Sequence, residues 1–384
     1  MKVLIVNNYL QSSIGGVENY LQSLVSYSEG NSPEITFRWF GVENKKTKIY
    51  QKFYNAATTK AIIAEIDTFK PDLIHCFSIG ATVTPHFMRY AKEQSIPIIY
   101  SFHDYYYICP KGFMLNNQEN ELYKKHRILD CVLHHRPKIN VFYDGLLNLK
   151  QSYHKSIIKK HIDYYLAPSE QLTEIIACEF NKPGELLANP VVFSNPNLNT
   201  QNSDYLLFVG RLIEEKGVLT LLKAFQQVLK NHPNEQLKIV GSGNFQDELE
   251  QYVSIHKIKN VAFLGSKNRD ELMLLYASAK FTIVPSEILE SYGNVVLESF
   301  AFDKTVISSN LIGFQKEITE TNSGLIFPYG NVQKLAEAIE KLLTNTELRK
   351  ELEQNGMRYV KNLSIENHLQ HLQMIYNKVL KREL

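Results

Sequence analysis

Cysteine is scarce in this sequence, and no long apolar run interrupts it. No stretch approaches the roughly 20 apolar residues that a membrane-spanning helix requires. The N-terminal run Met1–Val6 is followed by two asparagines and is too short for the core of a signal peptide. The four cysteines lack the regular spacing of a disulfide framework; they are Cys76, Cys109, Cys131 and Cys178. We therefore expect a cytoplasmic protein that could touch a membrane only peripherally.

A strong charge of one sign is also lacking. The 42 Lys and Arg residues nearly balance the 40 Asp and Glu residues, and the net charge of +2 gives no reason to expect a nucleic-acid partner. Basic clusters do occur in the first half, at Tyr123–Arg127, His134–Lys138 and His154–His161. They could meet anionic lipid or a phosphorylated acceptor, or they could be solvated helix faces.

The glycine signatures of two common nucleotide sites are missing. The sequence contains neither G-x-G-x-x-G nor a Walker P-loop. A nicotinamide-dependent dehydrogenase would need the first, together with an acidic residue for the ribose, and an ATPase would need the second. Neither class is supported.

The sequence does contain a repeated alternation of short β-type runs with helical segments. With 384 residues, 44% apolar and 21% charged, the chain can form two globular domains. Alternation of this kind predicts α/β domains with parallel sheets. The predicted strands are 3–6, 35–40, 73–77, 98–102 and 164–167 in the first half, and 205–209, 237–240, 261–264, 281–284, 305–308 and 324–327 in the second.

Asn and Pro accumulate over residues 186–204, which predicts a linker with a hinge near 189–201. We therefore predict an N-terminal domain over 1–189 and a C-terminal domain over 190–363. Residues 364–384 form an amphipathic helix, with Ser364 as its N-cap, that packs on one or both domains. Its apolar positions are Leu369, Leu372, Ile375 and Leu380.

Ligands of such sheets bind beyond the carboxyl ends of the strands, so the loops there are the candidate sites. Gly15 and Gly16 precede a helix after the first strand, where backbone N–H groups can approach an anion. Arg211 and Lys216 follow the strand at 205–209 and suit the two phosphates of a nucleotide diphosphate. Pairing with Glu214 and Glu215 is the alternative.

Two carboxylates, Glu290 and Glu298, flank the turn before the helix that follows the strand at 281–284. Carboxylates accept hydrogen bonds from vicinal hydroxyls, so one could hold a sugar and the other the ribose of a nucleotide. Gly293, at the expected helix start near residue 292 or 293, could contact phosphate. Gly241 and Gly243, at another strand end, leave room for a nucleotide.

His103 and Asp104 directly follow the predicted strand at 98–102. A histidine there can donate to a hydroxyl or titrate near neutral pH. Separately, the Cys131-x2-His134 spacing allows a zinc hypothesis that would include Cys109 and His135, although the irregular gap from Cys109 argues for packed thiols and a basic loop instead.

Taken together these loops resemble the retaining GT-B glycosyltransferases of family 4, the glycosyl transferases group 1. The resemblance spans nearly the whole chain and is most specific in the second domain. It implies two Rossmann-like β/α/β domains facing a central cleft. The implied site residues are His103, Arg211, Lys216 and Glu290 as catalytic residues, with Gly15, Gly16, Gly210, Gly241, Gly243, Ser291, Tyr292, Gly293, Asn294 and Glu298 in donor binding.

The resemblance implies a hexosyltransferase-type enzyme of polysaccharide or cell-surface glycan assembly. It would move a sugar, with retention, from a nucleotide-diphosphate sugar to a hydroxyl of a glycan, lipid-linked or other acceptor. Arg211 and Lys216 would hold the diphosphate, Glu298 the ribose, and Glu290 and His103 the transferred sugar. No Asp-x-Asp occurs in the sequence, so we expect no metal and no cofactor beyond the co-substrate. A catalytically silent nucleotide-sugar-binding subunit is the alternative.

Overall fold

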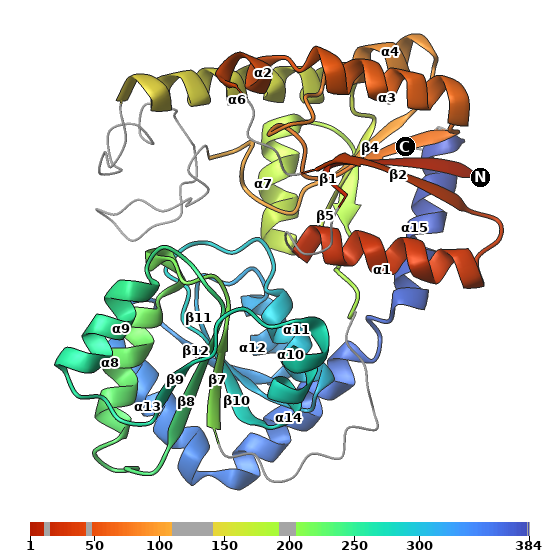
Figure 1. Ribbon diagram of the computed structural model, residues 1–384. Helices are drawn as coiled ribbons and strands as arrows, with labels where there is room; N and C mark the ends of the chain where they lie inside the picture. Colours follow the sequence, from red (N-terminus) through yellow and green to blue (C-terminus); the bar gives the residue numbers. More distant parts are fainter. Residues whose placement is uncertain (11–15, 44–47, 110–140, 192–204, 382, 384) are drawn as a thin grey trace. The chain divides into compact units, whose positions relative to one another are not determined.

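All eleven predicted strands are present, and a twelfth was missed. The computed structural model describes residues 1–384 except 11–15, 44–47, 110–140, 192–204, 382 and 384 (Figure 1). The missed strand is β6, only three residues long, in a segment whose Lys, Pro and Gly gave no β-type signal. The chain divides into two compact units, Met1–Pro190 with Ile365–Leu384, and Val191–Ser364.

The first unit is built on a six-stranded parallel sheet in the order β2-β1-β3-β4-β5-β6. Its strands are β1 (Lys2–Tyr9), β2 (Thr36–Val42), β3 (Leu73–Cys76), β4 (Ile98–Ser101), β5 (Tyr164–Ala167) and β6 (Gly184–Leu186). Its helices are α1 (Gly16–Asn31), α2 (Ile49–Phe53), α3 (Ala56–Phe69), α4 (Phe87–Glu93), α6 (Val141–His161), α7 (Glu170–Phe180) and α15 (Ile365–Leu380). Helices α1 and α15 pack together on one face, and α3, α4 and α6 succeed one another on the other (Figure 1).

The second unit also has six parallel strands, in the order β12-β11-β10-β7-β8-β9. Its strands are β7 (Tyr205–Val209), β8 (Gln236–Val240), β9 (Val261–Phe263), β10 (Ala279–Val284), β11 (Val306–Ser309) and β12 (Gly324–Phe327). Its helices are α8 (Val218–Val228), α9 (Gln246–Ile255), α10 (Arg269–Ala277), α11 (Asn294–Ala301), α12 (Gln315–Thr321), α13 (Val332–Thr344) and α14 (Thr346–Val360), with a 3₁₀ turn over Glu214–Lys216. The four central strands are almost fully buried because helices cover both faces.

Helix α15 is the last element of the chain and packs in the core of the first unit. Its predicted apolar positions Leu369, Leu372 and Ile375 are buried, together with Tyr376, which the prediction omitted. Leu380 was predicted to lie on the same face but is exposed, because the helix ends there. No helix in the described part of the chain is both long and apolar enough to cross a membrane.

Hydrogen bonds also attach α15 to the first unit. His368 Nδ1 lies 3.0 Å from the Ala188 carbonyl oxygen, and its Nε2 lies 2.7 Å from the Tyr20 hydroxyl. A carbonyl only accepts, so the neutral ring carries its proton on Nδ1, and the Tyr20 hydroxyl donates to Nε2. About two turns of helix further on, the Tyr376 hydroxyl lies 2.7 Å from His75 Nδ1.

Candidate functional site

In the second sheet the strand order reverses between β7 and β10, which are neighbours in the sheet although β8 and β9 lie between them in the sequence. This is the position at which open α/β sheets bind ligands, beyond the carboxyl ends of the strands. The loop after β7 carries Gly210, Arg211 and Lys216, and the loop after β10 carries Glu290 and Ser291. Most of the predicted donor residues therefore follow these two adjacent strands.

Lys216 and Glu290 form an ion pair across the reversal point. Lys216 Nζ lies 2.9 Å from Glu290 Oε1, and only 18% and 17% of the two side chains are exposed. The Ser286 hydroxyl donates to the same carboxylate oxygen. The predicted alternative for Lys216 was Glu214 or Glu215, whereas the structure pairs it with a residue of the other loop.

Burial alone would raise the pKa of Glu290. The attraction of Lys216, the Ser286 hydroxyl and Arg211 outweighs that effect and holds the pKa below its ordinary value. Glu290 is therefore a carboxylate at neutral pH, with the two positive groups of the loop after β7 beside it.

Backbone hydrogen bonds tie the surrounding loops into one rim. The Glu287 N–H donates to the Glu215 carbonyl at 2.8 Å, which joins the loops after β10 and β7. The Leu212 N–H donates to the Ser242 carbonyl at 2.9 Å, which joins the loops after β7 and β8. Paired backbone groups of this kind give the charged side chains a fixed base.

Gly241 is required by this loop packing. Its φ is +133°, and a Cβ there would lie 1.8 Å from the Gly210 carbonyl oxygen. A Cβ at Gly243 would likewise meet the Leu212 carbonyl, at 2.1 Å. From the sequence, these glycines were expected to leave room for a nucleotide. In the structure, their missing side chains leave room for the loop after β7.

The turn from Ser291 to Asn294 leads into α11, which begins at Asn294, one or two residues later than predicted. Tyr292 was predicted to bind the donor, but its ring is buried and packs edge-on against Phe314 at 5.3 Å. Its ring thus supports the turn from beneath. Gly293 is buried at the helix start with a φ of +125°.

Glu298 lies on α11 and accepts a hydrogen bond from the Tyr276 hydroxyl, with 2.5 Å between the oxygens. Burial raises the pKa of Glu298, and this hydrogen bond opposes the rise. Tyr276 holds the carboxylate in one orientation, as a residue that grips a diol requires. The sequence gave no signal for Tyr276.

In the first unit His103 follows β4, as predicted, and is half-buried against aromatic rings. Its ring lies 5.7 Å from Phe77, in a stacked arrangement, and 5.8 Å from Tyr20. Burial lowers the pKa of His103 to about 4. It is neutral at pH 7, so of the two predicted alternatives the structure favours hydrogen bonding over titration near neutral pH.

Gly16 is the first residue of α1 and is exposed, whereas Gly15 lies outside the described residues. Two residues later, Glu18 is buried and accepts a hydrogen bond from Asn7 Nδ2 at 2.8 Å. This bond joins the start of α1 to the end of β1, so Glu18 has a structural role.

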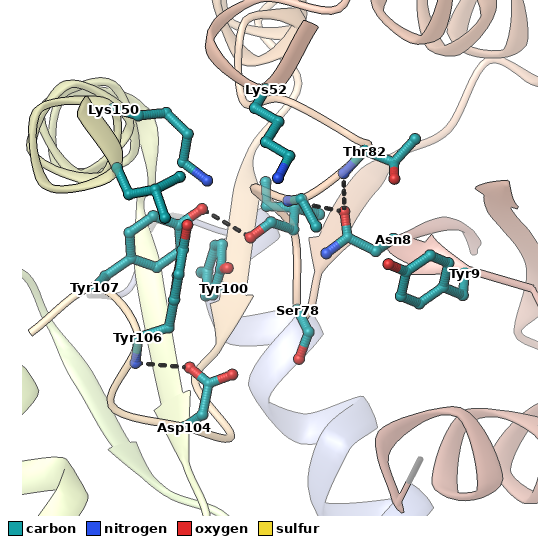
Figure 2. A pocket seen from close by; sticks show the side chains of 13 residues that line it. Asn8, Tyr9, Lys52, Ser78, Thr82, Tyr100, Asp104, Tyr106, Tyr107 and Lys150 are labelled. Atoms are coloured by element: carbon teal, nitrogen blue, oxygen red, sulfur yellow. Dashed lines mark hydrogen bonds between the residues drawn. The ribbon is translucent and has the colours of Figure 1, made fainter. Parts of the chain in front are cut away.

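A pocket of about 630 Å³ opens at the carboxyl ends of the first sheet. It lies where that sheet's strand order reverses, between β1 and β3, so it occupies the position expected of a ligand site. Figure 2 shows its lining. The lining includes Asn8, Tyr9, Lys52, Ser78, Tyr100, Asp104, Tyr106, Tyr107 and Lys150. Only Asp104 was singled out from the sequence.

No group of three or more His, Cys, Asp or Glu side chains within the described ranges is arranged to hold a metal ion. Cys109 is a buried free thiol. The remaining members of the zinc hypothesis, Cys131, His134 and His135, lie outside the described residues.

Comparison with known proteins finds similarity to one family of enzymes. Residues 193–359 match the family model described as glycosyl transferases group 1. The match lies entirely within the second unit, which is therefore similar to this family. One curated relative is the capsular polysaccharide biosynthesis glycosyltransferase CapM of Staphylococcus aureus. It is 27% identical over 184 residues, and the match covers 47% of this chain and 48% of the relative. The matches span about half the length of curated relatives such as this one.

Solved structures extend the comparison from the second unit to the whole chain. Sucrose-phosphate synthase from Thermosynechococcus elongatus has a TM-score of 0.74 at 17% identity and covers 100% of both chains. Anabaena Alr3699/HepE, solved in complex with UDP-glucose, has a TM-score of 0.70 at 16% identity, covering 98% of this chain and 100% of the other. The chain has the GT-B fold, with two Rossmann-like α/β units, as the sequence predicted.

Proposed function

We propose that this chain is a metal-independent, retaining glycosyltransferase of the hexosyltransferase type, which moves a sugar from a nucleotide-diphosphate sugar to a hydroxyl of a glycan or lipid-linked acceptor. The observation that carries the proposal is the Lys216–Glu290 pair beside Arg211 at the strand reversal of the second sheet. Support for the donor class comes from the family match and from the relative solved with UDP-glucose.

The leaving group of such a transfer is a diphosphate, and fixed positive groups stabilise the charge that develops on it. Arg211 and Lys216 supply two such charges from one loop. Lys216 pairs with Glu290 at 2.9 Å, so a bound diphosphate either shares Lys216 with Glu290 or replaces Glu290 as its partner. Glu290 is then free to accept hydrogen bonds from hydroxyls of the transferred sugar.

Glu298, oriented by Tyr276, accepts from the ribose diol. His103 is neutral at pH 7 and contributes a hydrogen bond to a sugar hydroxyl. Metal independence rests on the cationic loop and on the absence of Asp-x-Asp from the sequence. Retention rests on the resemblance alone, and it is tested by the anomeric configuration of the product in a proton NMR spectrum.

The donor is found by a thermal-shift screen of UDP-, GDP-, ADP- and CMP-sugars, because a ligand of the folded state raises the melting temperature. Each stabilising sugar is then offered with candidate acceptors in buffer containing EDTA. Transfer by the chain alone supports an enzyme. Binding without transfer to any acceptor favours a silent binding subunit, and stabilisation by NAD alone contradicts the proposal.

The phosphate assignment is tested by calorimetry with the nucleoside diphosphate of the best donor. Arg211→Ala and Lys216→Ala are each expected to weaken binding at least about tenfold, because a hydrogen bond to a charged group contributes roughly 1.5–3 kcal/mol. Lys334→Ala is the matched control, since that side chain is 57% exposed on α13 of the same unit. Unchanged affinity in both test variants would refute the assignment.

A further inference from the structure

The pocket of the first unit has two lysines on its wall. Lys52 enters from α2 and Lys150 from α6, and Figure 2 shows both ammonium groups directed toward the same space. Lys150 is only 3% exposed. A lysine that is so deeply buried is uncommon unless something compensates its charge.

Among the residues that the structure describes, the groups in contact with Lys150 do not neutralise it. Lys150 Nζ donates to the Gly80 carbonyl at 2.8 Å and lies 5.1 Å from the centre of the Tyr106 ring. Both partners are neutral. Burial, together with the charge of Lys52, lowers the pKa of Lys150 to about 8. An anion between the two ammonium groups would relieve this repulsion.

The rest of the wall is aromatic and firmly held. The Tyr107 hydroxyl donates to the Ile79 carbonyl at 2.7 Å, and the rings of Tyr106 and Tyr107 meet edge-on with centres 5.0 Å apart. Gly80 makes this possible, since a Cβ there would lie 2.3 Å from the Tyr107 hydroxyl oxygen. Such ring faces and edges can pack against the C–H groups of a sugar ring.

The loop that forms the floor is equally fixed. Asn8 Oδ1 accepts a hydrogen bond from the backbone N–H of Thr82 at 3.1 Å (Figure 2). It accepts another from the backbone N–H of Val83 at 3.0 Å. Near Tyr106, Asp104 accepts from the Tyr106 N–H at 2.9 Å and keeps exposed surface. The pocket therefore joins a cationic part to a carboxylate and an aromatic wall, and its volume suits one or two sugar rings.

We propose that this pocket binds the acceptor, and that the acceptor carries a phosphate or carboxylate group on its sugar, held between Lys52 and Lys150. The inference rests on the proposed transferase function, because it takes the pocket's ligand to be the substrate that receives the sugar. Asp104 then lies among the hydroxyls of the same ligand, where a carboxylate accepts hydrogen bonds.

The test is calorimetry with glucose, galactose and mannose, each as the free sugar, the 6-phosphate and the uronate. At least one charged form is expected to bind ten times or more tightly than its neutral parent. Whether the 6-phosphate or the uronate binds more tightly then decides whether the anionic group is a phosphate or a carboxylate. If no charged form binds, or if the neutral sugars bind equally well, the proposal is wrong.

Lys150→Met and Lys52→Met are each expected to reduce the affinity of the charged probe at least fivefold. Lys52 is half-buried on a short surface helix, so Lys52→Met remains informative if loss of the Gly80 contact destabilises Lys150→Met. Arg211→Ala is the control for phosphate binding at the second unit, and it is expected to leave probe affinity unchanged.

Full probe affinity in both lysine variants, or loss of binding in Arg211→Ala instead, would overturn the assignment of the pocket. Failure of the proposed function has a different signature. In that case no nucleotide sugar stabilises the wild-type chain, whereas the charged probe still binds and still depends on the two lysines.

Discussion

Glu290 is the residue whose surroundings say most about its role. It is a carboxylate placed beside Lys216 and Arg211, the groups proposed to bind an anion. A negative charge in that position opposes binding of a diphosphate. Its presence there is explained if Glu290 contacts the sugar, and if Lys216 exchanges its ion pair with Glu290 for one with the phosphates during the reaction.

This predicts opposite effects of one substitution on binding and on turnover. Glu290→Gln removes the competing charge, so the affinity for the nucleoside diphosphate is expected to stay equal or to rise. The transfer rate is expected to fall about 100-fold or more, because an interaction used on the reacting sugar is lost. Calorimetry and a transfer assay measure the two effects.

Glu347→Gln is the matched control, since that side chain is 88% exposed on α14 of the same unit. It is expected to change neither quantity. Weaker diphosphate binding in Glu290→Gln would contradict the assignment of Glu290 to the sugar and would place it among the residues that organise the phosphate site.

Sequence reasoning identified the charged residues at the strand ends but not their partners. Arg211, Lys216 and Glu290 stand next to recognisable strands, so their positions were predictable. The pairing of Lys216 with Glu290 was not, because it depends on two loops meeting in the folded chain. Tyr276, a helix residue with no local motif, was missed for the same reason.

At the scale of elements, α15 is held by buried histidines whose charge the core does not tolerate. Burial lowers the pKa of His368 to about 3, and burial also lowers the pKa of His75 well below its ordinary value. Both pKa values lie below the unfolded value near 6.5. At pH values between the folded and the unfolded pKa, the unfolded chain binds protons that the folded chain does not.

Stability is therefore expected to fall as the pH drops below about 6.5, by roughly 1.4 kcal/mol per pH unit for each such histidine. The measurement is the free energy of unfolding in denaturant between pH 7 and 5. His368→Gln should reduce this slope, while His371→Gln should not, because His371 is about half exposed on the same helix. Equal slopes in wild type and His368→Gln would contradict the prediction.

The strand alternation was predictable at this scale, but the pocket of the first unit was not. Apolar β-type runs such as those of β3 and β10 carry their signal locally. Lys52 and Lys150 lie on two helices far apart in the chain, and single lysines on helices normally face solvent. Only the packing of α2 against α6 brings them to one wall.

At the scale of the whole molecule, the first unit depends on the last helix of the chain. Removing residues 365–384 takes Leu369, Leu372, Ile375, Tyr376 and Val379 out of its core. Each such side chain contributes about 1.5–3 kcal/mol by burial, so their sum rivals the 5–15 kcal/mol that stabilises a typical domain. We expect the first unit to be unfolded in this deletion variant.

Trp39 makes the outcome measurable, because it is the one tryptophan of the sequence and lies in β2 of the first unit. Its emission in the deletion variant is expected to match that of the denatured protein. Removal of residues 381–384 alone, beyond the end of α15, is the control and should leave the emission native. Native emission without α15 would show that the first unit is stable on its own.

The chain runs from the first unit into the second and returns to finish the first with α15. During synthesis, residues 1–190 leave the ribosome long before the helix that completes them, and the whole of the second unit is made in between. The early half is therefore synthesised with its α15-binding surface uncovered, and that apolar surface favours aggregation until the final helix has been made.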